Sequence, residues 1–205
     1  YVVNGLISTA SRSSFLAFLV GGLVFVMFSP KKYRRAVLLL GVVGLIGFAS
    51  LASDYFWDRM GTITYVGEDI DNKDTGSDRL VLWEAQIDMF LQHPAGCGHR
   101  CTAVLSPLYL DDKYLTGPEE NRARSSHNTY LTLLVEQGII GGMVGLLFLV
   151  WLLRLSLRIR GEVSTREGIL PAVFPAAIAI LCAILAADVF VDYLKMEIRI
   201  WYVAV

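Results

Sequence analysis

The stretch Ala36-Val-Leu-Leu-Leu-Gly-Val-Val-Gly-Leu-Ile-Gly-Phe-Ala-Ser-Leu-Ala-Ser53 contains no charged residue, follows the basic cluster Lys31-Lys-Tyr-Arg-Arg35 and ends at Asp54. A helix that crosses a bilayer needs about 20 predominantly apolar residues, and this run with its flanks is long enough. The whole chain agrees with a membrane class, because 55% of its 205 residues are hydrophobic and its mean hydropathy is +0.53.

Three further apolar runs predict helices of the same kind. They cover residues of about 5–29, 130–153 and 168–187, and together with 36–53 they give about four transmembrane helices. The stretch Ile200-Trp-Tyr-Val-Ala-Val205 predicts the start of a fifth. The apolar opening without an initiator Met, together with the abrupt end, predicts a fragment of a longer chain. We therefore expect an all-α polytopic membrane protein whose residues 1–205 form a single membrane domain.

The positions of lysine and arginine predict the orientation, because short basic loops stay in the cytoplasm. One basic connection is Lys31–Arg35. The other holds four arginines: Arg154, Arg158, Arg160 and Arg166. Residues 54–128 then form one large, partly helical loop on the periplasmic side of a bacterial inner membrane. This loop has 13 acidic and 7 basic residues, a net charge of −6 against −1 for the whole chain, and no basic patch that would suit a nucleic acid.

Hydrophobic spacing predicts one helix within this loop. Leu80, Trp83, Ile87 and Phe90 recur at helical spacing, so an amphipathic helix should begin at Arg79 and end before Pro94. The aromatic group Tyr55-Phe-Trp57 suits the membrane interface. Residues 65–77 predict an irregular segment, and the stretch from Cys101 to His127, with its prolines and glycine, predicts a loop.

Cys97 and Cys101 lie close together in a turn-rich part of the loop. A periplasmic location favours a disulfide between them, because that compartment oxidises thiols, and two free thiols are the next alternative. Zinc is a third alternative, since His93 and His99 would complete a set of four usual ligands, although the spacing matches no familiar zinc module. Cys182 lies in an apolar run, where a small side chain needs no further role.

Arg12 is a charged residue at the start of an apolar run and precedes Lys31 by 19 residues, a helical rise of about 28 Å. With Lys31 in the cytoplasm, Arg12 reaches the outer interface of the membrane. A charge in such a run is a candidate functional site, and nearby hydroxyls, including that of Ser11, could share hydrogen bonds with its ligand. The alternative is an arginine that only extends toward lipid phosphate.

Two more candidates belong to the loop. Arg79 opens the predicted helix, where unpaired backbone amides attract anions; the alternative is a surface salt bridge with Asp78 or Asp74. His127 lies at the start of the run 130–153, and a neutral imidazole there can accept a proton near pH 7. The alternative for His127 is a helix cap or an ordinary surface residue.

Charged and small residues surround His127 in sequence. Arg122 and Arg124 precede it and would attract a phosphate. Glu136 follows within the apolar run, where it could pair with an arginine of another helix or bond a neighbour. The sequel Gly138-Ile-Ile-Gly-Gly142 predicts a surface for close packing against another helix.

Three motifs appear in order along the chain. Ser8-Thr-Ala-Ser-Arg-Ser13 opens the first run, and Arg79-Leu-Val-Leu-Trp83 precedes Phe90-Leu-Gln-His-Pro94 and Gly96-Cys-Gly98. Ser126-His-Asn-Thr-Tyr-Leu131 then precedes Glu136-Gln-Gly-Ile-Ile-Gly141. With the predicted topology, these motifs resemble the O-antigen ligase and O-antigen polymerase superfamily of bacterial membrane glycosyltransferases, in the C-terminal half of its members. Ser13 departs from the usual Ser-Arg-Gly element.

The resemblance implies transfer of a glycan from undecaprenyl diphosphate, in the outer leaflet, to an acceptor sugar hydroxyl, with no cofactor and no metal. By position, Arg12 and Arg79 would bind the diphosphate and stabilise the charge left on it. His127 would deprotonate or orient the acceptor hydroxyl. Four further residues would help to bind the diphosphate or the acceptor: Arg122, Arg124, Ser11 and Asn128.

Several activities share this chemistry. A ligase, the activity that we expect, would use lipid A core as acceptor, a polymerase would use another lipid-linked glycan, and a protein acceptor is a third option. A lipid-linked glycan transporter or flippase would also bind diphosphate through membrane arginines, but it would place its charges near the middle of the bilayer, whereas Arg12, Arg79 and His127 map to one face. A purely structural membrane protein would need none of the three.

Overall fold

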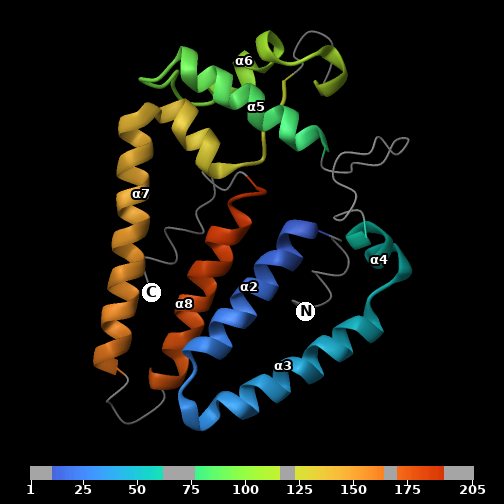
Figure 1. The fold of residues 1–205 in the computed structure, drawn as a ribbon, viewed down its shortest axis with the longest axis vertical. Coiled ribbons are helices and arrows are strands. Elements are labelled where there is room, and N and C mark those ends of the chain that lie inside the picture. The colour runs from blue at the N-terminus through green and yellow to red at the C-terminus, as the bar shows by residue number, and fades with distance from the viewer. Residues whose placement is uncertain (1–10, 62–76, 116–122, 164–169, 192–205) are drawn as a thin grey trace. The chain divides into compact units, whose positions relative to one another are not determined.

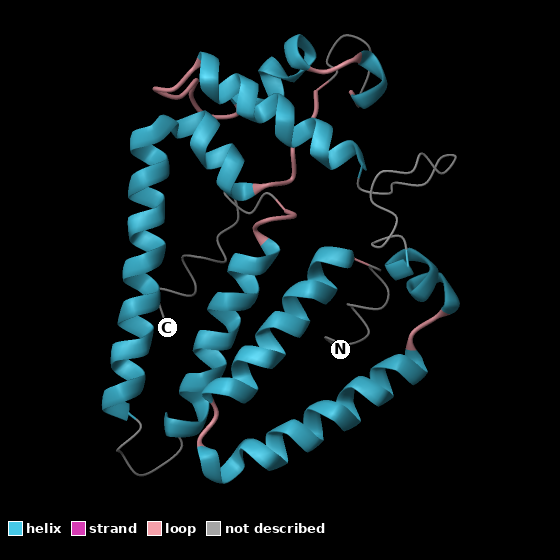
Figure 2. Ribbon diagram, viewed as in Figure 1, coloured by secondary structure: helices cyan, strands magenta, loops and turns pink. Residues whose placement is uncertain are grey.

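The computed structural model describes residues 11–61, 77–115, 123–163 and 170–191. Within these ranges the chain is helical and contains no β-strand, which confirms the predicted all-α class (Figure 2). The predicted start of a fifth helix at Ile200 lies outside the described residues, as do residues 65–76 of the irregular segment predicted for 65–77. Ser77, the last residue of that segment, begins a helix instead.

The chain divides into two compact units. The first comprises Tyr1–Ile63 with Val150–Ala187, and the second comprises Thr64–Leu149 with Asp188–Val205. The long helix α7 (Thr129–Val163) contributes residues to both.

The four predicted apolar runs all form helices. α3 (Lys31–Leu51) and α7 are long and apolar enough to cross a membrane, whereas α2 (Arg12–Phe28) and α8 (Leu170–Ala187) are shorter apolar helices. α3 begins at Lys31 rather than at 36, and α7 ends at Val163 rather than at 153. The difference arises because lysine and arginine end an apolar run but are good helix formers.

In the first unit, α2 packs along α8 (Figure 1). The buried residues of α2 are small and recur every four positions: Ser13, Ala17 and Gly21. A methyl group on Gly21 would lie 3.1 Å from the Cβ atom of Ala183 and 3.4 Å from the carbonyl oxygen of Ala179. Small residues at this spacing let helix backbones approach closely, which is how apolar helices associate within lipid.

Two arginines bind carbonyl groups at the C-terminal end of α2. Arg34 of α3 donates from Nη2 to the carbonyl oxygen of Met27 at 2.8 Å. Arg160 of α7 donates to the carbonyl oxygen of Phe28 at 3.3 Å, and its guanidinium lies 4.6 Å from the centroid of the Phe28 ring. The last carbonyls of a helix lack partners within it and carry partial negative charge, so cations stabilise this end. The two basic connections of the sequence therefore meet at one end of α2.

The short helix α4 (Asp54–Gly61) is held by aromatic rings. Phe56 is fully buried, and its ring centroid lies 5.6 Å from that of Phe15 in α2 and 5.3 Å from that of Phe48 in α3. Tyr55 and Trp57 stay 65% and 42% exposed. Of the three aromatic residues predicted for the membrane interface, the central one is therefore part of the core.

The second unit contains α5 (Ser77–Gln92), α6 (Cys101–Tyr109), the 3-10 turn η2 (Asp112–Tyr114) and the first part of α7. α5 confirms the helix predicted between Arg79 and Pro94.

The buried face of α5 differs from the predicted one. Leu82, Ala85 and Met89 are buried, whereas Leu80 and Ile87, which belong to the predicted spacing, are 52% and 49% exposed. Leu82 and Ala85 pack with residues of α6 and of the segment after it. The prediction was wrong in part because no sequence pattern indicated α6, the helix that packs against this face.

α6 contradicts the prediction of a loop after Cys101. Pro107 lies inside this helix and lacks the N–H that the carbonyl of Ala103 would normally accept. The hydroxyl of Ser106 donates to that carbonyl at 2.7 Å instead. The helix runs through the proline because the neighbouring serine satisfies the carbonyl that the proline leaves unpaired.

Candidate active site

α5 carries Arg79 in its first turn and Trp83 one turn later, on the same side of the helix. Arg79 is half-buried, and its guanidinium lies 5.9 Å from the centroid of the Phe190 ring, within the range of a cation–π contact. The Trp83 ring centroid lies 6.4 Å from the same Phe190 ring. One aromatic side chain from just beyond α8 therefore contacts both motif residues of α5.

Trp83 also connects α5 to the segment of His127. Its indole Nε1 donates to the carbonyl oxygen of Ser126 at 3.2 Å. This hydrogen bond fixes the backbone directly before His127, so the structure brings the Arg79 and His127 motifs together in one unit through Trp83.

His127 has an exposed side chain and a backbone φ of 53°. Such a left-handed conformation is uncommon for a residue other than glycine and persists where the surroundings enforce it. Here the surroundings are the Trp83 bond to Ser126 on one side and the start of α7 on the other. An exposed imidazole on a constrained backbone is suited to meet a substrate group.

Asn128 caps α7. Its side-chain Oδ1 accepts hydrogen bonds from the backbone N–H groups of Tyr130 and Leu131, at 3.0 and 3.1 Å. Asparagine is among the preferred residues at this position, because its oxygen satisfies amides that have no partner in the helix. Asn128 is also buried, so the structure gives it a capping role beside the substrate-binding role that we expected.

The segment after α8 binds the start of α7. The backbone N–H of Thr129 donates to the carbonyl oxygen of Asp188 at 2.9 Å. The Thr129 hydroxyl lies 2.7 Å from the carbonyl oxygen of Val191 and 3.2 Å from Oδ1 of Asp188, which is fully buried. Thr129, two residues after His127, is therefore held in place by the segment from Asp188 to Val191.

A break in α7 lies about two and a half turns after Thr129, at Gly138. Gly138 has φ 68° and ψ −172°, which no helix allows. The N–H of Ile139, which would bond Val135 in a continuous helix, donates to the carbonyl oxygen of Pro94 at 3.0 Å, and Val135 accepts from the N–H of Cys97 at 3.1 Å. The loop from His93 to Cys101 thus takes the hydrogen bonds that the break releases.

Gly96 allows the loop to approach the backbone of α7 closely enough for these hydrogen bonds. A methyl group on Gly96 would lie 2.6 Å from the backbone nitrogen of Gly138, and one on Gly138 would clash with the carbonyl group of Ala95. The glycines of residues 138–142 were predicted to pack against another helix; Gly138 instead forms the break and receives the loop.

Cys97 and Cys101 are joined by a disulfide, with their Cα atoms 5.7 Å apart. The bond closes the loop that lies on the break in α7. Because both sulfurs are bonded to each other, they offer no thiolate to zinc. Among the described residues, no three or more His, Cys, Asp and Glu side chains gather as a metal site.

Glu136 is buried beside this loop. Its Oε1 accepts a hydrogen bond from the hydroxyl of Thr102 at 2.9 Å, and its Oε2 lies 3.6 Å from Nδ1 of His99, a residue whose side chain is 66% exposed. Glu136 therefore bonds neighbours of the disulfide loop, which is one of the two alternatives that its position left open.

Arg124 is held against α6 and η2. Its backbone N–H donates to Oγ of Ser106 at 2.8 Å, and its Nη1 donates to the carbonyl oxygen of Tyr114 at 3.3 Å. Arg122 lies outside the described residues.

Arg12 belongs to the first unit, where it begins α2 and is half-buried. Ser11 is the cap of this helix: its Oγ accepts from the N–H of Ser14 at 3.3 Å and lies 3.0 Å from Oγ of Ser13. A hydroxyl cluster therefore surrounds the backbone amides at the start of α2, next to the arginine.

Sequence reasoning missed Asp188, Phe190 and Thr129. A signal existed for Asp188, because an acidic residue at the end of an apolar run is often functional or paired. No pattern pointed to Phe190, whose ring contacts residues more than a hundred positions earlier.

Comparison with known proteins gives one family. Residues 1–146 match the family model described as O-antigen ligase, a span that includes α2, α5, His127 and the break in α7. Neither the curated proteins nor the solved structures contain a match.

Proposed function

This chain belongs to the O-antigen ligase family, and from that membership we propose that it is a membrane glycosyltransferase that moves a glycan from undecaprenyl diphosphate to an acceptor sugar hydroxyl. Lipid A core is the proposed acceptor. The observation that carries the proposal is the Trp83 bond to Ser126, which joins the Arg79 motif and the His127 motif within one unit.

The proposed topology has four spans, at α2, α3, α7 and α8, in the inner membrane. The basic connections face the cytoplasm and residues 54–128 face the periplasm. The meeting of Arg34 and Arg160 at one end of α2 supports this arrangement, because it requires both connections to lie on the same side.

In the proposed reaction the acceptor hydroxyl attacks the anomeric carbon of the glycan. The bond from that carbon to the diphosphate oxygen breaks, and the diphosphate leaves with the electron pair. His127 takes the proton of the hydroxyl, and its exposed side chain is open to that group. Arg79 and Arg12 stabilise the charge that develops on the diphosphate, which guanidinium groups bind with two parallel hydrogen bonds. This is the role that a metal ion often fills.

The test is glycan transfer by the purified full-length protein from an undecaprenyl-diphosphate donor to lipid A core, with a chelator present. His127→Ala should lower the transfer rate by about 100-fold or more, the usual contribution of a general base, while donor binding is retained. His99→Ala is the matched control, since His99 is another exposed histidine of the same unit.

Four other outcomes would contradict parts of this proposal. Unchanged transfer by His127→Ala would remove His127 from the mechanism. Growth of the donor glycan instead of modified lipid A core would make the protein a polymerase. Movement of the donor across the bilayer without any new glycosidic bond would make it a transporter. Loss of transfer on chelation, with recovery on adding metal, would contradict the metal-free mechanism.

A further inference from the structure

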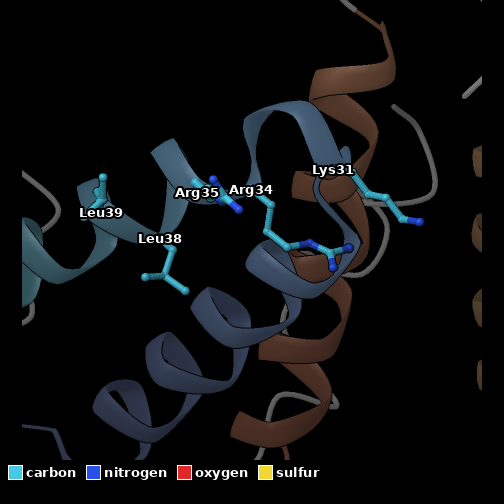
Figure 3. Close-up of a pocket in the computed structure, with 5 residues that line it drawn as sticks. All are labelled: Lys31, Arg34, Arg35, Leu38 and Leu39. Atoms are coloured by element: carbon cyan, nitrogen blue, oxygen red, sulfur yellow. The ribbon is translucent and has the colours of Figure 1, made fainter.

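The first turns of α3 form a basic hollow on the surface of the first unit (Figure 3). Its volume is about 440 Å³, and three cations and two leucines line it: Lys31, Arg34, Arg35, Leu38 and Leu39. None of these five residues is acidic, so the hollow attracts an anion.

Arg34 is the best-oriented cation of the hollow. Its Nη2 donates to the carbonyl oxygens of Met27 and Ser29, at 2.8 and 3.4 Å, which holds the guanidinium beside the end of α2. A guanidinium has five N–H donors, so others remain for a ligand. An arginine whose plane is already fixed binds phosphate with little further loss of side-chain freedom.

The leucines continue the hollow toward the apolar part of α3. Leu38 and Leu39 are 49% and 64% exposed and lie about one turn beyond Arg34 and Arg35, as Figure 3 shows. Beyond them the helix stays apolar and exposed, with Leu40 71% exposed. Cations followed by an apolar wall match a molecule that has an anionic head and an acyl chain.

We propose that this hollow binds the headgroup of an anionic phospholipid, whose acyl chain lies along Leu38 and Leu39. The position at the charged end of a candidate membrane span places the hollow at headgroup depth. Basic pockets at this depth bind anionic lipid heads by charge and by hydrogen bonds to phosphate. The site is separate from the glycosyl-transfer residues and does not depend on the proposed reaction.

The test measures phosphatidylglycerol binding to the full-length protein in detergent by native mass spectrometry, with phosphatidylcholine of the same acyl chains for comparison. Lys31→Gln combined with Arg35→Gln removes two cations of the hollow. It leaves Arg34 of α3 hydrogen-bonded to the end of α2. The affinity for phosphatidylglycerol should fall by roughly 30-fold, because each basic residue near a lipid surface contributes about one kcal/mol.

Two further variants make the result specific. Lys32→Gln with Arg158→Gln removes the same charge from exposed positions of the same unit that do not line the hollow, and should change the affinity little. Lys31→Arg with Arg35→Lys keeps the charge and should keep binding, which separates lost binding from lost folding.

The proposal fails if the hollow variant and the Lys32/Arg158 control lose the same affinity, because binding would then follow overall charge. It also fails if phosphatidylcholine binds as tightly as phosphatidylglycerol. Full displacement of the lipid by millimolar inorganic phosphate would show that the hollow takes a free anion rather than a phospholipid.

Discussion

At His127 the backbone has a φ of 53°, so the side chain leaves the chain in a direction that an ordinary extended or helical residue could not give it. Two neighbours enforce this geometry: Trp83 binds the carbonyl before it, and Asn128 caps the helix after it. The placement of the imidazole therefore depends on residues that need not touch a substrate.

Asn128 allows a prediction about stability. Asn128→Ala removes the acceptor for the N–H groups of Tyr130 and Leu131 and should lower the free energy of unfolding by about 1 kcal/mol. Asn128→Asp keeps an acceptor oxygen and should retain most of the stability. Thermal unfolding in detergent, followed by tryptophan fluorescence, measures both; equal loss in the two variants would argue against the cap.

Phe190 allows a prediction about donor binding. Phe190→Ala removes the ring beside the Arg79 guanidinium, a contact worth about 0.5–1 kcal/mol, and should raise the KM for the lipid-linked donor by roughly two- to fivefold. Phe190→Tyr keeps the ring and should behave as the wild type. If Phe190→Tyr is as impaired as Phe190→Ala, the aromatic contact is not what matters.

Single residues were predictable only where a motif carried them. Arg79 and His127 could be chosen as candidates from the sequence, because their neighbours form motifs of known order, and their catalytic roles stay predictions. Phe190 could not, since nothing in the composition around it indicates which distant helix its ring will contact.

Among the elements, the loop from His93 to Cys101 and the break in α7 depend on each other most closely. Gly96 and Gly98 both have positive φ values, 91° and 96°, but an added methyl group would meet the backbone of residues 136–138 only at Gly96. The pair therefore separates the effect of backbone conformation from that of close contact.

Gly96→Ala should destabilise the protein far more than Gly98→Ala. Both substitutions strain a left-handed backbone, at a cost of about 1 kcal/mol, but the new methyl group at position 96 would also lie 2.6 Å from Gly138 N, whereas position 98 has no atom within 4 Å. Thermal unfolding temperatures of the two variants decide the matter, and equal shifts would mean that the loop does not rest on the break.

The sequence predicted the elements that are defined by apolar runs. α3, α7 and α8 lie where uncharged stretches predicted helices, because hydrophobicity alone marks a helix that lipid can surround. α6 was missed because a proline such as Pro107 normally ends a helix. The hydrogen bond from the Ser106 hydroxyl to the carbonyl that Pro107 leaves unpaired cannot be predicted from the sequence alone. The wrong face of α5 followed from that omission.

At the scale of the molecule, the basic connections and the acidic segment from 54 to 128 predict which parts face each side of the membrane. In a Cys182→Ala background, a cysteine at Asp111 should react with a membrane-impermeant maleimide in intact cells. A cysteine at Arg158 should react only after the inner membrane is permeabilised. Both positions are exposed, so accessibility on the protein does not bias the comparison.

The opposite labelling pattern would reverse the proposed orientation and would place His127 away from the leaflet that presents the donor. Labelling of both positions in intact cells would contradict the single span, α7, that the proposed topology places between Asp111 and Arg158.

The exchange of hydrogen bonds at Gly138 also bears on how the chain reaches its fold. The amides around the break find partners only when a loop made much earlier in synthesis returns to them. The helix around Gly138 can therefore form fully only when the loop from His93 to Cys101 binds it. This long-range pairing raises the contact order of the second unit and should slow its folding relative to a simple helical hairpin. Until α7 has been made, the loop has no backbone partner at this position, and incompletely packed segments of this kind favour misfolding.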